Sequence, residues 1–317
     1  MSRCVLIALS LVAHVHFSDA FLVGGLARTY WGSARGSGGE RVSGRRNMAR
    51  ATGATVLKSQ QTEAPAGPQE RHPIYWIDEC EPHEMTRELA RKNEQYLYKF
   101  LNHKGIAPFN LDAFKEAERA YAAFSREAGG EPPIIIDSCC GTGRSTYNLA
   151  RENPTSFVVG VDKSEVRLNR NRIFRESSNG PAENMILVRA NCIDFWRLIW
   201  QAGWKIDRHF ILYPNPYPKP GQHFLRWHGS PAFPILLKMG GEIEVRASWR
   251  TYLEEMAIAA EEIGGVKDAV IEPLQFGKNL EKAISNFERK YVLAGQPIYR
   301  LRFPRLQQIP FDSSRNE

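Results

Sequence analysis

The 317-residue chain has few cysteines, and their spacing fits neither a metal site nor a disulfide framework. Cys4 lies near the N-terminus, Cys80 and Cys192 are isolated, and Cys139 and Cys140 are adjacent. A cysteine-ligated metal protein and a small disulfide-stapled domain are therefore excluded. Free thiols in this arrangement are typical of a protein that folds in a reducing environment. We also expect no bound metal.

Long hydrophobic runs and internal repeats are also missing. Beyond the first twenty residues, no segment is apolar enough to cross a bilayer. The composition is that of an ordinary globular protein, with 43% hydrophobic and 24% charged residues. A chain of this length can bury a sizeable core in one large domain or two small ones.

Acidic residues are scarce at the N-terminus, which explains most of the net charge of +7. Residues 1–58 carry eight Lys or Arg and two Asp or Glu, a surplus of +6. Residues 78–131 have a net charge of −3, whereas residues 144–250 have a net charge of +7. The positive charge of residues 144–250 fits binding of an anionic partner. It is equally well explained by basic residues on helix faces that are exposed to water.

The N-terminal segment reads as a targeting leader. An apolar run over Val5–Val15 and small residues at the end of residues 1–20 indicate a signal peptide. Within residues 21–72, residues 21–58 are rich in Arg, Gly and Ser and predict a transit peptide. Residues 59–72, with Pro65, Gly67 and Pro68, predict a linker. The pair resembles the two-part plastid leaders of algae with secondary plastids. A mitochondrial address and initiation at Met48 are the alternatives, and we expect no membrane segment in the mature form.

The rest of the chain predicts an α/β fold. Helical patterns over Glu84–Leu101 and Asp112–Arg126 indicate an N-terminal helical extension in residues 73–131. In residues 132–317, apolar runs alternate with helical stretches, which indicates a Rossmann-like parallel sheet with helices on both faces. We expect strands over Ile134–Asp137, Phe157–Asp162, Met185–Val188, Phe210–Tyr213, Gly241–Val245 and Ile298–Phe303, and helices from near Ser145 and Ser164 and over Asp194–Gln201, Pro231–Met239 and Trp249–Ile263.

A glycine turn follows the first expected strand. Gly141 and Gly143 would allow a tight turn and close approach of a ligand to the backbone at a helix N-terminus. Asp162 ends the next strand about twenty residues later, where a carboxylate suits a ribose diol. Ser145 and Thr146 occupy the third-glycine region of a dinucleotide fingerprint, so the pattern favours S-adenosylmethionine, with a dinucleotide as the alternative.

A stiff loop follows the fourth expected strand. Its sequence is Pro214-Asn-Pro-Tyr-Pro-Lys-Pro220, and four prolines restrict its backbone. Asn215 would contact a base edge and is the one candidate catalytic residue, Tyr217 would stack on a base, and Lys219 would meet a phosphate. The basic and aromatic residues just beyond, His223, Arg226, Trp227 and His228, extend a strip suited to RNA.

Residues 134–303 resemble the bacterial tRNA (guanine-N7)-methyltransferases, most closely a divergent branch. The resemblance rests on Asp137-Ser-Cys-Cys-Gly-Thr-Gly-Arg-Ser, Gly160-Val-Asp162, Val188-Arg-Ala-Asn-Cys192, the loop over 214–219, Ala247-Ser-Trp249 with Tyr252, and Ser285-Asn-Phe-Glu288. It implies methyl transfer from S-adenosylmethionine to N7 of a guanine in tRNA. The implied cofactor contacts are Asp137, Cys139, Gly141, Gly143, Asp162, Asn191 and Cys192, and the implied substrate contacts are Asn215, Tyr217, Lys219, Ser248, Ser285, Asn286 and Glu288.

The chain departs from the family pattern at the expected pocket. The family usually has Asp where this chain has Asn191, Asn215 and Ser248, and Thr-Lys in place of residues 285–286. These departures leave alternatives open: a methyltransferase acting on another RNA nitrogen or a small amine, a non-catalytic RNA-binding scaffold on the same fold, or an oxidoreductase. The expected partner is tRNA, and a homo-oligomer or helper subunit is possible.

Overall fold

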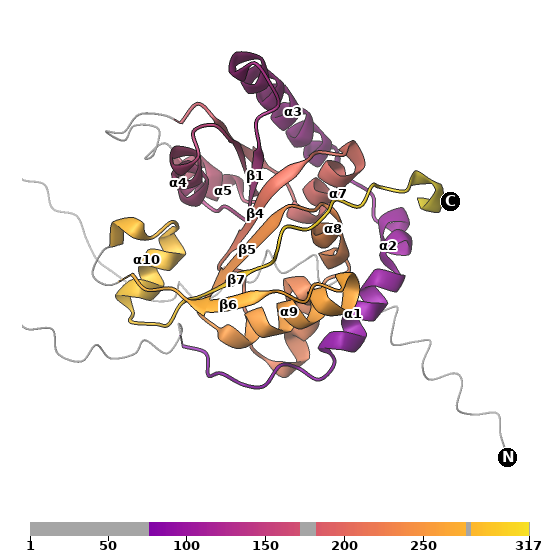
Figure 1. Cartoon of the computed structure of the whole chain (residues 1–317), viewed down its shortest axis with the longest axis vertical. Helices are drawn as coiled ribbons and strands as arrows, with labels where there is room; N and C mark the ends of the chain where they lie inside the picture. The colour runs from indigo at the N-terminus through magenta and orange to yellow at the C-terminus, as the bar shows by residue number, and fades with distance from the viewer. Residues whose placement is uncertain (1–75, 172–181, 277–279, 317) are drawn as a thin grey trace, which may run out of the picture. The chain divides into compact units, whose positions relative to one another are not determined.

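The structure is a computed structural model that describes residues 76–171, 182–276 and 280–316 (Figure 1). The leader expected over residues 1–72 lies outside the described residues. Within the described ranges, no helix combines the length and apolar character that crossing a membrane requires.

The described residues form helices and strands in the alternating order that the sequence predicts. The α-helices are α1 Thr86–Gln95, α2 Leu97–His103, α3 Pro108–Ala128, α4 Arg144–Glu152, α5 Glu165–Leu168, α7 Cys192–Ala202, α8 Phe233–Lys238, α9 Arg250–Gly264 and α10 Asn286–Leu293. The strands are β1 Ile134–Ser138, β2 Phe157–Asp162, β3 Met185–Arg189, β4 Ile206–Leu212, β5 Glu242–Ala247, β6 Val270–Pro273 and β7 Tyr299–Arg302. The predicted α/β fold is confirmed.

The seven strands form one sheet in the order β3-β2-β1-β4-β5-β7-β6. Strands β1 to β5 run parallel, and β7 runs antiparallel to both of its neighbours. The chain moves outward from β1 to β3 and then returns to place β4 on the other side of β1. Crevices for ligands form at such a switch point, at the carboxyl ends of the strands. Here those ends are in register, with Asp137 opposite Phe210.

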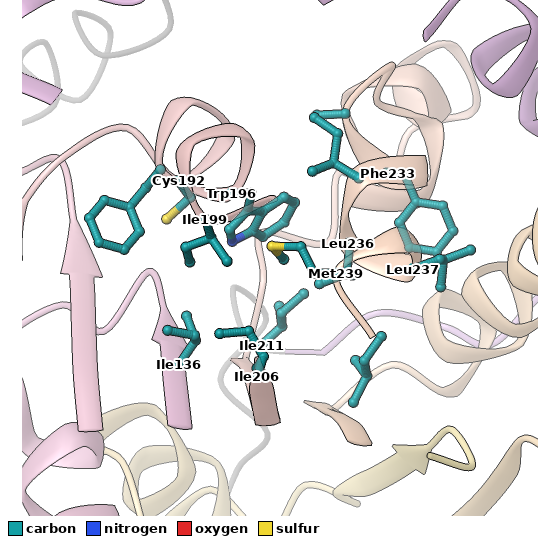
Figure 2. Close-up of a cluster of buried hydrophobic side chains, with 14 of the residues drawn as sticks. Ile136, Cys192, Trp196, Ile199, Ile206, Ile211, Phe233, Leu236, Leu237 and Met239 are labelled. Carbon is teal, nitrogen blue, oxygen red and sulfur yellow. The ribbon is translucent and has the colours of Figure 1, made fainter. Parts of the chain in front are cut away.

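The core lies on both faces of the sheet because β1 is buried on both sides. Ile134 and Ile136 belong to a large cluster with α7, α8 and α9, part of which Figure 2 shows around Trp196 and Ile211. Ile135 belongs to a second cluster under α4, with Leu149, Val158 and Phe210 among its members. Side chains that alternate along β1 therefore face opposite layers.

The N-terminal helices share the larger core. Pro108 begins α3 and Gly129 ends it in the left-handed conformation, as is typical of helix boundaries. Leu97, Leu101 and Phe114 are buried in the same cluster as β1 and α7. The extension therefore packs into the same hydrophobic core as the sheet.

Two expectations about the elements were wrong. The single helix expected over Glu84–Leu101 is two helices that meet at Tyr96, because α1 packs on α9 while α2 packs on the C-terminal residues 313–316. The sheet is not wholly parallel, and strand β6 was missed. Its four residues are half exposed at a sheet edge and end in a proline, so they carry little strand signal.

Candidate active site

The turn after β1 is held by a carboxylate from β2. Asp162 Oδ2 accepts a hydrogen bond from the Gly141 N–H at 2.9 Å, and Oδ1 accepts one from the Ser164 N–H at 2.8 Å. Gly143 has φ +80°, and a Cβ there would lie 2.4 Å from Leu187 Cδ1. The turn thus favours glycine at position 143 for its conformation, and a Cβ there would also displace the end of the Leu187 side chain.

Asp137 provides a buried acceptor beside this turn. Its side chain is 0% exposed, and Oδ2 accepts hydrogen bonds from Ser145 Oγ at 2.6 Å and Thr146 Oγ1 at 2.7 Å. Its other oxygen, Oδ1, has no hydrogen-bond partner among the described residues. Burial raises the pKa of Asp137 to about 6, and the two hydroxyl donors oppose that rise. A ligand that brings a donor or a positive charge to Oδ1 would relieve this cost.

The turn between β3 and α7 forms a second wall. Asn191 caps α7 by accepting a hydrogen bond from the Ile193 N–H at 2.9 Å. Its own N–H donates to Asn110 Oδ1 at 2.9 Å, and Asn110 Nδ2 donates to Asp194 Oδ2 at 2.5 Å. Lys104 forms an ion pair with the same Asp194 carboxylate. The N-terminal extension therefore anchors this turn with buried polar contacts.

The extension also completes the start of α9. The N-cap residue, Trp249, makes no side-chain capping bond. Glu79 replaces such a cap: its carboxylate accepts hydrogen bonds from the Arg250 N–H at 2.9 Å and the Thr251 N–H at 3.0 Å. A negative charge at a helix N-terminus is favourable. This carboxylate lies just beyond Ser248, where the resembled family has Asp.

The proline loop has an unusual backbone at two aromatic residues. Tyr213 has φ +55° and Tyr217 has φ +45°, in the left-handed region that non-glycine residues seldom adopt. Asn215 is exposed between them, and its Oδ1 accepts a hydrogen bond from the Tyr217 N–H at 3.4 Å. Lys219 is exposed at the end of the loop.

A buried arginine holds the strained loop. Arg226 is 3% exposed, and its Nε and Nη2 donate to the Tyr217 carbonyl at 3.2 and 3.0 Å. Its Nη1 pairs with Glu255 on α9, and the guanidinium lies 4.7 Å from the centre of the Trp249 ring. The fork of donors therefore joins the loop to α9.

Glu255 is the centre of this buried cluster. Burial alone would raise its pKa, but hydrogen bonds from His228 and Arg226 lower it to about 2, so the carboxylate stays charged. Burial lowers the pKa of His228, which is therefore neutral and donates through Nε2 to Glu255 at 2.9 Å. The expectation that Arg226 and His228 face RNA was wrong, because both are buried.

The α10 segment connects the two sides of the site. Asn286 Nδ2 donates to Thr142 Oγ1 at 3.1 Å, and Arg144 Nη1 donates to Asn286 Oδ1 at 3.3 Å. Ser285 caps α10 by accepting from the Glu288 N–H at 3.1 Å. The start of α10 is thus fixed against the glycine turn.

Glu288 has a structural environment. It is 0% exposed, and its Oε1 accepts from Tyr213 Oη at 2.6 Å and Arg246 Nη1 at 3.0 Å. Its Oε2 accepts from the Ile284 N–H at 2.6 Å. Both oxygens are engaged inside the protein, so Glu288 fixes the end of β4 at Tyr213 rather than presenting a free carboxylate.

Ser248 lies beside the proline loop. It lines a cavity of about 10 Å³ together with Tyr213, Pro214, Pro216, Ala247, Trp249, Tyr252 and Tyr291. Such a cavity holds no more than a water molecule, so a larger ligand would have to bind on the exposed side that bears Asn215. A larger cavity of about 540 Å³ lies near Pro132 and Pro154, before β1 and β2, at the opposite end of the strands.

Comparison with known families decides the class of protein. Residues 131–301, more than half of the chain, match a family model described as putative methyltransferase. The chain belongs to this methyltransferase family. The match begins just before β1 and ends inside β7, so it covers the sheet that carries both the glycine turn and the proline loop.

Several curated relatives of this methyltransferase share one name. This chain is 26% identical to the tRNA (guanine-N(7)-)-methyltransferase of Ectopseudomonas mendocina, over 64% of this chain and 83% of that protein. It is 22% identical to the protein of the same name from Buchnera aphidicola, over 69% of this chain and 86% of that protein. Among solved structures, it is similar to the 16S rRNA (adenine(1408)-N(1))-methyltransferase from Catenulisporales acidiphilia, with 17% identity and a TM-score of 0.43, over 59% and 94%.

The fold places most of the expected site residues in two groups at the carboxyl ends of the strands. Asp162 bonds directly to the Gly141 N–H of the glycine turn, and Asp137 bonds to Ser145 and Thr146 just after that turn. Cys139 contacts Cys192 beside Asn191. Asn215, Tyr217 and Lys219 lie on the adjoining loop, and Ser285 and Asn286 lie against the glycine turn. No described group of three or more His, Cys, Asp or Glu side chains has the arrangement of a metal site.

Sequence reasoning missed the residues that hold these groups in place. Asn110, Glu255 and Arg246 are separated from their partners by 81, 29 and 42 positions. None sits in a motif. The one sequence feature at Asn110 is that a polar residue lies in the first turn of a helix. Polar side chains there usually face water, so this feature does not indicate a buried contact.

We expect binding of S-adenosylmethionine to weaken as pH falls. The cofactor carries a positively charged amino group, and protonation of Asp137 removes the charge that would attract it. With a pKa of about 6, the dissociation constant should rise roughly fourfold from pH 7.5 to 5.5 and about tenfold by pH 5. Titration calorimetry over this range measures it. The Asp137→Asn variant should show a flatter profile, and an equally steep one would contradict the assignment.

We expect Arg226→Lys to slow methyl transfer and leave cofactor affinity intact. Lysine keeps the charge beside Glu255 but loses the fork that holds the Tyr217 carbonyl. The turnover number should fall about tenfold, since misplacing a reacting group by about 1 Å is costly, while the dissociation constant of S-adenosylmethionine stays within about twofold.

The matched control is Arg87→Lys, which changes an exposed arginine paired with Glu261 and Glu262. This variant should retain wild-type turnover. If Arg226→Lys lost cofactor affinity in proportion to turnover, the arginine would support the whole fold and not the loop.

Proposed function

We propose that this methyltransferase transfers the methyl group of S-adenosylmethionine to N7 of a guanine in tRNA. The observation that carries the proposal is the pairing of β1 with β4, which places the glycine turn and Asp137 directly beside the proline loop. The names of the curated relatives support the acceptor. The net charge of +7 over residues 144–250 suits an anionic partner.

The residues present fit the cofactor. The unpartnered Oδ1 of Asp137 is a buried acceptor beside the turn, and it would receive the cofactor's amino group. Asp162 and Asn191 lie on the neighbouring turns, where they would hold the ribose and adenine. When bound, S-adenosylmethionine supplies an electrophilic methyl group on its sulfonium.

The proline loop orients the base in this proposal. Guanine N7 carries an unprotonated lone pair, so its attack requires no general base. Asn215 is exposed and contacts a base edge, Tyr217 stacks on the ring and Lys219 meets a phosphate. His209, the histidine on β4, is buried against Ser138 and burial lowers its pKa to about 3, so it stays neutral as part of the core.

The missing carboxylates predict a slow enzyme. Methylation at N7 leaves a cationic base, and a fixed negative charge beside it stabilises the transition state by several kcal/mol when preorganised. Asn215 keeps the shape and hydrogen-bonding capacity of an aspartate without its charge. The chain thus retains the means to position guanine and lacks part of the electrostatic stabilisation.

The test is incubation of the full chain with methyl-labelled S-adenosylmethionine and unmodified tRNA, followed by nucleoside analysis. We expect labelled 7-methylguanosine. A labelled adenosine or cytidine derivative would assign the enzyme to another nitrogen. Cofactor binding without transfer to RNA would contradict the proposed acceptor, and absence of cofactor binding would favour a scaffold on a methyltransferase fold.

A second set of variants tests Asn215. Asn215→Asp should preserve or increase methylation because it adds the charge that the product requires. Asn215→Ala should lower turnover at least about tenfold because it removes the positioning group. Turnover measured on the same tRNA, with cofactor affinity as the control, distinguishes the effects. A fully active alanine variant would rule out a positional role.

A further inference from the structure

Two cysteines that are isolated in the sequence meet at the cofactor side of the site. The Cys139 and Cys192 sulfurs lie 3.5 Å apart, although the residues are separated by 53 positions. Cys139 is exposed and Cys192 is buried, and neither is in a disulfide. Figure 2 shows Cys192 at the start of α7, on the same side of the sheet as Ile136.

The backbone at Cys139 is a second, independent observation. This residue has φ +61°, a conformation that glycine adopts freely and other residues adopt at a cost of about 1–2 kcal/mol. A cysteine in this position sacrifices stability that a glycine would retain. Strain of this kind persists where the side chain has a function.

The surroundings make the two thiols unequal. The hydrogen bond with Cys139 and burial raise the pKa of the Cys192 thiol, so Cys192 stays protonated at rest. Cys192 Sγ also lies 3.8 Å from the Val161 carbonyl at the end of β2. Burial likewise raises the pKa of Cys140, which makes that neighbour a poor nucleophile. Exposed Cys139 is thus the thiol that a dissolved oxidant reaches.

The two sulfurs belong to the two turns that face the proposed cofactor. Cys139 lies between β1 and Gly141, whose N–H is bonded to Asp162. Cys192 begins α7 immediately after Asn191. A covalent bond between them would tie the β1–α4 turn to the β3–α7 turn.

We propose that Cys139 and Cys192 form a reversible disulfide under peroxide, and that this bond lowers the affinity of the site for S-adenosylmethionine. The second half rests on the proposed function, because it concerns the same cofactor site. The first half concerns only the thiols.

The chemistry balances with hydrogen peroxide as the oxidant. The Cys139 thiol releases its proton, and the thiolate attacks one peroxide oxygen. The O–O bond breaks, a sulfenic acid and hydroxide form, and the hydroxide combines with the released proton as the first water. Cys192 then attacks the Cys139 sulfur, the S–O bond breaks, and the thiol proton leaves with the second hydroxide as water. The net reaction converts two thiols and one peroxide into a disulfide and two waters.

The bond would shift the glycine turn. Closing a 3.5 Å contact to bonding distance moves one or both turns by ~1.5 Å. The Gly141–Asp162 hydrogen bond and the acceptor at Asp137 lie within this turn and its flanks. We expect the dissociation constant of S-adenosylmethionine to rise at least about tenfold, since displacements of this size typically cost a site that much or more.

The experiment treats the full chain with hydrogen peroxide, blocks remaining thiols with N-ethylmaleimide and maps the peptides by mass spectrometry. Calorimetry then measures S-adenosylmethionine binding before oxidation, after it, and after dithiothreitol. The expected result is a peptide pair linked through Cys139 and Cys192 that lacks two hydrogens, weaker binding after oxidation, and recovery on reduction.

Variants separate this pair from the other thiols. Cys139→Ser and Cys192→Ser should each bind the cofactor equally well before and after peroxide, each variant being compared with itself. Cys80→Ser is the matched control, because Cys80 is also exposed, and it should respond to peroxide as the wild type does.

Several results would overturn the proposal: no linked peptide, a bond between Cys139 and Cys140, or the expected link with unchanged affinity. The mapping needs neither tRNA nor methyl transfer. A chain that forms the link but never binds S-adenosylmethionine would therefore refute the proposed function and the regulatory effect, while the disulfide itself would stand.

Discussion

The parallel pairing of β1 with β4 is the constraint on which the rest of the site depends. It makes the glycine turn and the proline loop neighbours, although they are some seventy residues apart in the sequence. Parallel strands cannot be joined by a tight turn, so the chain must cross over between them, and here the crossover contains β2, β3 and their helices. The walls of the site are therefore products of the same crossover that completes the sheet.

Buried polar contacts hold these walls in place. Asn110 and Asp194 fix the turn before α7, Arg226 and Glu255 fix the proline loop, and Glu288 fixes the end of β4. Each contact satisfies groups that would be costly to bury alone. Two of these three contacts involve the N-terminal extension: Asn110 lies on α3, and His83, which precedes α1, donates its N–H to Glu255 at 2.9 Å. The extension thus stabilises the residues that hold the site in place.

The sequence predicted the parts of this design that local patterns specify. The apolar runs of β1 and β2 and the glycines after β1 lie within a residue or two of the expected places, because burial on both faces and positive φ leave strong local signals. The supporting contacts could not be predicted from the sequence. Arg226 and His228 look like a surface strip until the fold brings them to Glu255, and the edge strand β6 owes its form to pairing with β7. Residues that meet only in the tertiary structure produce no periodic pattern in the sequence from which their contact could be predicted.

All three non-glycine residues with positive φ in the described part of the chain lie at the site: Cys139, Tyr213 and Tyr217. At Tyr213 the strain is outweighed, because its ring is buried in the core and its hydroxyl donates to Glu288. Cys139 is exposed, so glycine there would relieve about 1 kcal/mol or more of backbone strain at little cost in packing. A laboratory selection for heat resistance would therefore favour glycine at position 139 and delete the thiol, so thermostability and the chemistry of that thiol compete at one backbone position.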